Sequence, residues 1–279
     1  MLHLIMINPS YETATWVWDA GYNTGPKQKL EELEAKGYLK LWELYREKAI
    51  WSELVKTITM IEQEDKEAVI VIMGVMHGAP DLTVGYKNTL MFACDDETAA
   101  LCKRFHILDL HSCLMGQQLA PYMQKEGLHL SIGEIPEYVI VGDPTHKTTA
   151  AFIFAELELI ERMVKALENK EKVDMKTLWD AVRAGYKTQI EQWENTDVAY
   201  WLKKDLDGRV AFLDGWLFPP EIQPPPQPPQ PPQPKKKLRI KLKIESDLTG
   251  NIYIGPFRVG KVYIYSLGKN IAGEAEEEE

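Results

Sequence analysis

A nine-residue run, AVIVIMGVM at 68–76, constrains the fold of this chain more than any other feature. The run is almost wholly apolar and rich in β-branched side chains, so both faces of the strand that it predicts must be covered. Two further runs have the same character, FHILDL at 105–110 and YVIV at 138–141. Such strands are typical of parallel sheets flanked by helices, and the pattern therefore predicts an α/β protein.

Segments with helical spacing of apolar residues alternate with these strands. Residues 2–7 are expected to form a first core strand, and 82–93 a hairpin or an edge strand. Helices are predicted at 27–64 with a break at Gly37, at 96–104, at 117–125, at 148–167 and after Asp174. This alternation favours one α/β domain over residues 1–218 with a largely parallel sheet.

Ten of the 17 prolines lie at 219–234, and this stretch marks the end of the predicted domain. Proline fixes φ and removes a hydrogen-bond donor, so the stretch predicts an extended linker, 219–237, that ends in three lysines. Alternating apolar and charged residues after it predict a small β-meander at 238–270. The glutamate-rich end, 271–279, is expected to be an unstructured acidic tail.

The composition restricts the kind of protein and its partners. With 279 residues, 45% of them hydrophobic, the chain is neither disordered nor a small disulfide scaffold. A net charge of −10 argues against nucleic acid as a partner. Three cysteines without CxxC spacing indicate a reducing compartment. No apolar run is long enough to span a bilayer, and we expect a soluble, cytoplasmic protein with no membrane contact.

The chemistry is expected where two predicted strands end. His77 and Gly78 follow the strand at 68–76, and Cys113 follows the strand at 105–110. In open parallel sheets, ligands bind beyond the carboxyl ends of the strands. If the two strands are neighbours, His77 can activate the Cys113 thiol, and the small residue Gly78 leaves an amide to bind an oxyanion. This arrangement suits acyl transfer through a thioester.

Two segments, VIVIMGVMHG at 69–78 and HILDLHSCLMG at 106–116, resemble the caspase-like cysteine peptidases. That group includes caspases, metacaspases, clostripain-like enzymes and CHAT-domain proteases, and VGDPTHKTTAAF at 141–152 is similar to the loop and helix that follow in CHAT domains. The resemblance implies a three-layer α/β/α sandwich, a Cys113 nucleophile, a His77 base, and an oxyanion hole formed by the Gly78 and Cys113 amides. It also implies a protein or peptide substrate and a latent enzyme switched on by a partner or by cleavage. Small bacterial members of the group are often found in defence systems.

The chain departs from the metacaspase pattern near the nucleophile. Metacaspases carry an acid two residues before the cysteine, where it holds a basic side chain of the substrate, but this position is His111 here. Their specificity is therefore not carried over. Asp109 and His111 remain candidates for substrate contact, and Asp143 is the better acidic candidate, with a turn or helix-cap role next to Pro144 as its alternative.

Other interpretations of these residues stay open. Cys113 is alternatively a buried structural cysteine with His77 in a turn, and the protein then an inactive scaffold presented by its proline-rich arm. His77, His111 and Cys113 offer three zinc ligands but lack a fourth, so we predict no metal and no cofactor. Residue 119 is Leu, where a phosphatase loop starting at Cys113 needs arginine. The basic segment at 235–243 predicts docking of a regulatory protein or of a second subunit through the β-appendage.

Overall fold

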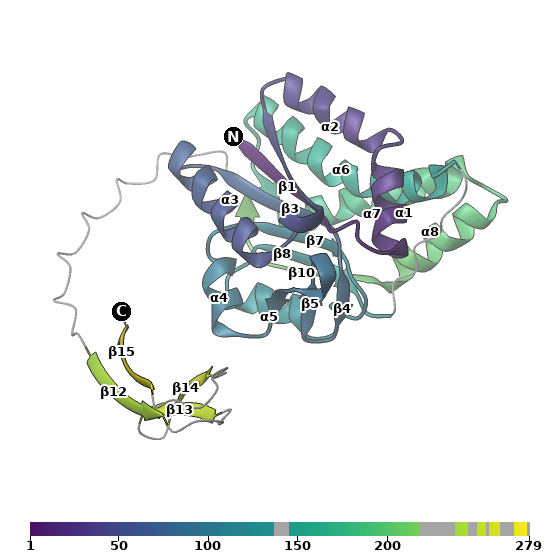
Figure 1. Cartoon of the computed structure of the whole chain (residues 1–279). Helices are drawn as coiled ribbons and strands as arrows, with labels where there is room; N and C mark the ends of the chain where they lie inside the picture. The colour runs from purple at the N-terminus through teal and green to yellow at the C-terminus, as the bar shows by residue number, and fades with distance from the viewer. Residues whose placement is uncertain (137–144, 218–237, 245–249, 255–256, 263–270, 278–279) are drawn as a thin grey trace. The chain divides into compact units, whose positions relative to one another are not determined.

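The computed structural model describes residues 1–136, 145–217, 238–244, 250–254, 257–262 and 271–277. It divides into two compact units, Met1–Glu221 and Ile222–Glu279. The first unit is built on a six-stranded sheet, in which five strands run parallel and only the last is antiparallel. In spatial order the strands are β2 (Leu39–Tyr45), β1 (Leu2–Asn8), β3 (Val69–Val75), β7 (Ile107–His111), β8 (Leu130–Glu134) and β10 (Arg209–Leu213) (Figure 1).

Helices pack on both faces of this sheet, so the predicted α/β fold with a mainly parallel sheet is confirmed (Figure 1). One face is covered by α1 (Thr13–Tyr22), α2 (Pro26–Ala35), α6 (Lys147–Asn169), α7 (Met175–Gln192) and α8 (Asp197–Gly208). The other face is covered by α3 (Trp51–Glu64), α4 (Asp96–Cys102) and α5 (Leu119–Lys125). Each face has its own apolar core, because alternate residues of β1 and β3 point to opposite sides.

Local capping chemistry sets two of the helix starts that the sequence predicts. The side chain of Asp95 accepts a hydrogen bond of 2.9 Å from the amide of Thr98 at the start of α4. Asp174 does the same for Thr177 in α7, at 2.6 Å. Each aspartate satisfies an amide that has no partner within its helix.

The prediction of helix across 27–64 is wrong in its middle part. Residues Leu39–Tyr45 form β2, a parallel edge strand against β1. Its apolar residues fit both a helical and an extended period, and pairing with β1 decides between the two. The segment 82–93 belongs to a separate antiparallel sheet of β4 (His77–Ala79), β5 (Leu82–Val84) and β6 (Leu90–Ala93). The predicted strand at 138–141 lies outside the described residues.

In the described residues of the second unit, the strands form two antiparallel pairs rather than the predicted meander. The strand β12 (Leu238–Ile244) pairs with β15 (Ile271–Glu277), and β13 (Gly250–Ile254) pairs with β14 (Phe257–Val262). Residues expected to be an acidic tail thus form a strand. Its register sets Glu276 opposite Arg239 and Glu274 opposite Lys241. Among the described helices of the whole chain, none has the length and apolar character needed to cross a membrane.

Candidate active site

The segments that carry His77 and Cys113 leave the sheet side by side. The strands β3 and β7 are parallel neighbours, and their register pairs Val75 with His111. The contact continues past the paired residues, since the amide of Met76 donates a hydrogen bond of 3.0 Å to the carbonyl of His111. His77 and Cys113 each follow these paired residues by two positions, and His77 is the first residue of β4, where it pairs with Val84 of β5. Both then lie at the carboxyl edge of the sheet, where open α/β sheets bind ligands.

Gly78 packs directly against the segment that contains Cys113. A Cβ atom at residue 78 would lie 2.1 Å from Oγ of Ser112 and 2.6 Å from the carbonyl oxygen of Cys113. Distances this short do not occur between a real Cβ and its neighbours, so only glycine allows the two chain segments to approach this closely. The requirement for glycine at residue 78 is therefore steric, and it does not depend on what the Gly78 amide binds.

Cys113 begins a tight turn that is held from two sides. The next residue, Leu114, has a φ of +61°, which is uncommon for a bulky side chain. A side-chain oxygen of Glu134 accepts a hydrogen bond of 3.0 Å from the amide of Ser112, and the backbone carbonyl of Glu134 accepts one of 2.9 Å from the amide of Gly116. Glu134, at the end of β8, thus fixes the chain before and after the half-buried Cys113.

The imidazole of His77 is oriented by Glu12, a residue that the sequence analysis does not single out. Nε2 of His77 lies 3.2 Å from Oε1 of Glu12, and both side chains are partly exposed, at 42% and 31%. Glu12 caps α1, where it accepts hydrogen bonds from the amides of Ala14 and Thr15. Burial alone would raise the pKa of the Glu12 carboxyl, but these amides outweigh it and lower the pKa, so the side chain remains a carboxylate. A capping pattern at 12–15 is the only signal of this role in the sequence.

Asp109 and His111, which were predicted to contact substrate, lie in a buried charged cluster behind the turn. The cluster is centred on the fully buried Arg209, whose guanidinium donates to Asp109 and Glu134 and, at 3.3 Å, to Glu156. Nη1 of Arg209 also lies 3.1 Å from Nδ1 of His111, which must accept the hydrogen bond. In this structure the two residues therefore bind Arg209 and are not exposed to a substrate.

The buried cluster holds more carboxyl groups than one guanidinium can neutralise. Burial is the main cause that raises the pKa of Glu134 to about 8, that of Asp205 to about 6, and that of Glu156 well above its usual range. Burial, followed by the charge of Arg209, keeps the pKa of His111 far below its usual value, so this imidazole is neutral. Glu134 consequently holds a proton at neutral pH.

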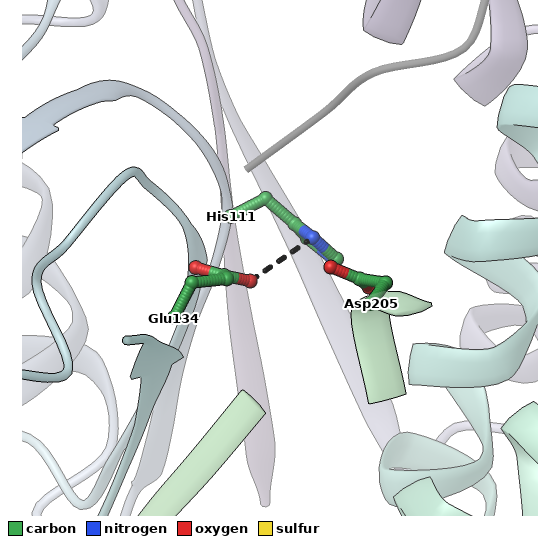
Figure 2. A group of neighbouring side chains, drawn as sticks. All are labelled: His111, Glu134 and Asp205. Carbon is green, nitrogen blue, oxygen red and sulfur yellow. Dashed lines mark ion pairs between the residues drawn. The ribbon is translucent and has the colours of Figure 1, made fainter. Parts of the chain in front are cut away.

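Three members of the cluster are close enough to hold a metal ion. Within the described residues, His111, Glu134 and Asp205 offer ligand atoms that all lie within 4.8 Å of one another, and Figure 2 shows their side chains converging. Arg209 already bonds to His111 and Glu134 from this space, so the cation of the cluster is its guanidinium. The set considered from the sequence, His77, His111 and Cys113, is not such a group in the described part of the chain.

The three cysteines, all in described segments, form no disulfide and differ in environment. Burial raises the pKa of the Cys102 thiol to about 12 and also raises that of the exposed Cys94. Both thiols are thus poor nucleophiles at neutral pH. Asp143, the remaining predicted substrate contact, lies outside the described residues. No protein-family model matches this chain, and no curated protein matches it either.

Proposed function

We propose that the protein is a cysteine endopeptidase in which Cys113 is the nucleophile and His77 the general base. The observation that supports this proposal is the parallel pairing of β3 and β7, whose last paired residues, Val75 and His111, precede His77 and Cys113 by two positions at the carboxyl edge of the sheet. A thiol and an imidazole from adjacent strand ends are the minimum that acyl transfer requires.

The proposed reaction has two steps. His77 takes the proton from the Cys113 thiol, and the thiolate attacks the carbonyl carbon of the peptide bond. The C–N bond then breaks as His77 returns the proton to the leaving amine, which leaves a thioester on Cys113. Water, deprotonated by His77, hydrolyses the thioester and frees the thiol. The amides of Gly78 and Cys113 are proposed to bind the oxyanion in both steps.

Two acidic residues assist these steps through the groups that they bind. Glu12 lies 3.2 Å from Nε2 of His77 and orients the imidazole ring. Glu134 holds the amide of Ser112 and so fixes the position of the Cys113 turn. Both are positioning residues, since neither touches the reacting atoms.

The resemblance to caspase-like peptidases extends the proposal beyond the reaction itself. It favours a caspase-like α/β/α sandwich, a latent enzyme in the cytoplasm, and activation by a partner or by cleavage, in a bacterial defence system for example. The strand pairs of the second unit are the proposed contact for a regulatory protein or a second subunit. Asp109 and His111 serve in this proposal to support the Cys113 turn from behind, because both are bonded to Arg209.

Selective alkylation of Cys113 tests the proposal without knowledge of the substrate. The full chain is treated with iodoacetamide at pH 7 and the modified cysteine is identified by mass spectrometry. Cys113 should react well before Cys94 and Cys102, whose raised pKa values keep them as thiols. His77→Ala should slow this reaction about tenfold or more, whereas His129→Ala, which changes a histidine of another loop, should not.

Peptide cleavage is the second arm of the same test. A peptide library is incubated with the chain, with Cys113→Ala and with the matched control Cys94→Ala. Cleavage that persists in Cys113→Ala removes this mechanism. If Cys113 is neither alkylated first nor needed for cleavage, the inactive peptidase-like scaffold is the better description of the protein.

A further inference from the structure

The ring of Tyr11 lies edge-on against the imidazole of His77, with the ring centres 6.2 Å apart and the ring planes at 77°. This is one of the favourable arrangements of two aromatic rings. Glu12 contacts the same imidazole at Nε2, from 3.2 Å. The torsion that sets the plane of a histidine ring has broad minima, and this side chain is 42% exposed, so a contact at Nε2 does not by itself fix the plane. The ring of Tyr11 provides a second contact that does.

Tyr11 is itself held by three neighbours. Its hydroxyl donates a hydrogen bond of 2.6 Å to Oδ1 of Asn88. Its ring meets the ring of Tyr86 at a centre-to-centre distance of 5.7 Å and an angle of 75°. Its amide donates a hydrogen bond of 3.2 Å to Oγ1 of Thr15, in the first turn of α1. Burial, followed by the charge of Glu12, raises the pKa of the Tyr11 hydroxyl, so this group stays protonated and remains a donor.

Two of these neighbours, Tyr86 and Asn88, belong to a strained turn between β5 and β6. Lys87 and Asn88 follow each other with φ values of +51° and +61°. Consecutive left-handed residues are typical of tight turns that favour asparagine and glycine, and the side chain of a lysine is strained there. The amide of Tyr86 donates a hydrogen bond of 2.9 Å to the carbonyl of the buried Ala49, so the turn is anchored to the first unit.

Burial of the turn does not offset this strain, since Lys87 and Asn88 are both exposed. Strained residues persist only where the surrounding structure holds them, and they gather at functional sites. The side chain that Asn88 contacts is Tyr11, which in turn contacts His77. The strained turn is thus linked to the proposed general base through one tyrosine.

From these contacts we infer that Tyr11 is a positioning residue for His77. Its ring holds the plane of the imidazole, and the turn at 86–88 holds Tyr11. The inference rests on the proposed function, in which Nδ1 takes the proton of Cys113 because Nε2 faces the carboxylate of Glu12. A ring that turns freely would direct Nδ1 at the thiol for only part of the time.

The first measurement concerns the imidazole alone, so its outcome does not depend on the reaction of Cys113. The full chain is labelled with ¹³C-histidine, and NMR relaxation gives the order parameter of the His77 ring, whose signal is assigned with His77→Ala. The order parameter should be about 0.85, as in rigid backbone, and Tyr11→Leu should lower it below about 0.6. Tyr200→Leu, which changes an exposed tyrosine of α8, should leave it unchanged. An unchanged value in Tyr11→Leu would overturn the inference.

The second measurement connects the ring to Cys113. Tyr11→Leu should slow the alkylation of Cys113 by iodoacetamide about fivefold, as expected for the loss of an aromatic pair, and should have no further effect in His77→Ala. An equal loss in both backgrounds would show that Tyr11 does not act through His77 and would overturn the inference. If His77→Ala leaves the alkylation rate unchanged while Tyr11→Leu loosens the ring, the proposed function fails and Tyr11 still holds the imidazole.

Two glycine variants test the turn, and they decide if Tyr11→Leu fails to fold. Asn88→Gly removes the acceptor of the Tyr11 hydroxyl but fits the left-handed conformation. It should lower the order parameter of the His77 ring and slow the alkylation of Cys113 about two- to threefold, as expected for the loss of one exposed hydrogen bond. Its control is Asn195→Gly, at another exposed asparagine with a φ of +64°, which should change neither quantity. If Asn88→Gly has no more effect than Asn195→Gly, the turn does not hold Tyr11 and the inference is overturned.

Discussion

Replacing Arg209 by methionine should be one of the most destabilising single changes in the first unit. The side chain is completely buried, and its guanidinium binds carboxyl groups from α6, β7 and β8. Methionine retains much of the aliphatic volume but removes the charge. The substitution therefore isolates the electrostatic role of the cluster behind the Cys113 turn.

The expected loss follows from the contacts of the guanidinium. Each hydrogen bond to a charged partner contributes about 1.5–3 kcal/mol, and Arg209 makes close ones with Asp109 and Glu134. Removing one partner of a buried ion pair typically costs about 3–5 kcal/mol, which agrees with that sum. At pH 5.5 the loss should be smaller than at pH 7.5, since protons can then neutralise the carboxylates that Arg209 leaves behind.

Urea unfolding followed by tryptophan fluorescence measures this loss in the first unit alone. All eight tryptophans lie between Trp16 and Trp216, so the signal does not report on the second unit. The matched control is Arg104→Met, which removes a two-pronged but partly exposed pair with Glu62 and should cost about 1 kcal/mol or less. If Arg209→Met costs no more than Arg104→Met, or if its loss does not shrink at pH 5.5, Arg209 is not the counter-charge that stabilises the buried carboxyl groups.

Three further predictions concern the same region. The free energy of unfolding should fall as pH rises from about 5 to about 8, because burial raises the pKa of folded Glu134 from 4.5 to about 8 and the unfolded chain releases the proton that it holds. Urea unfolding at a series of pH values measures this slope, and Glu134→Gln should flatten it. An unchanged slope in Glu134→Gln would contradict the assignment of the proton to Glu134. Gly78→Ala should reduce the alkylation rate of Cys113 at least tenfold, since its Cβ would meet Ser112 at 2.1 Å, whereas Gly37→Ala, with no atom within 4 Å, should leave the rate unchanged. Glu12→Gln should slow the alkylation of Cys113 two- to fivefold, as expected for loss of a partly exposed ion pair of about 0.5–1 kcal/mol. Glu53→Gln, at the start of α3, is its control. If Glu12→Gln is alkylated as fast as the natural chain, Glu12 only caps α1.

Much of the fold could be predicted because its elements carry local signals. The strands β1 and β3 are apolar along their whole length, as strands covered on both faces must be. Edge strands lack this signal. In β2 most side chains are partly exposed, and its apolar spacing is equally compatible with a helix. For the same reason the antiparallel edge strand β10 has no clear pattern of its own.

The candidate site divides in the same way. His77 and Cys113 could be singled out because each follows a recognisable buried strand, and only the adjacency of β3 and β7 had to be assumed. Glu12 could not be linked to His77, since the capping pattern around it describes α1 and not its spatial neighbours. Asp109 and His111 were expected to face a substrate, because no residue near them in the chain indicates that both bind Arg209, about a hundred residues later.

The sequence by itself determined the α/β class, most of the buried strands, the starts of α4 and α7, and the order in which a histidine and a cysteine follow two of those strands. These features depend on side chains within a few residues of one another, where periodicity and hydrogen bonding act locally. The tertiary structure alone decided that β2 is a strand, that Arg209 binds the buried carboxyl groups, and that Glu12 contacts His77. Each of these depends on contacts between distant residues, and such contacts exist only after the sheet has set its strand order and register.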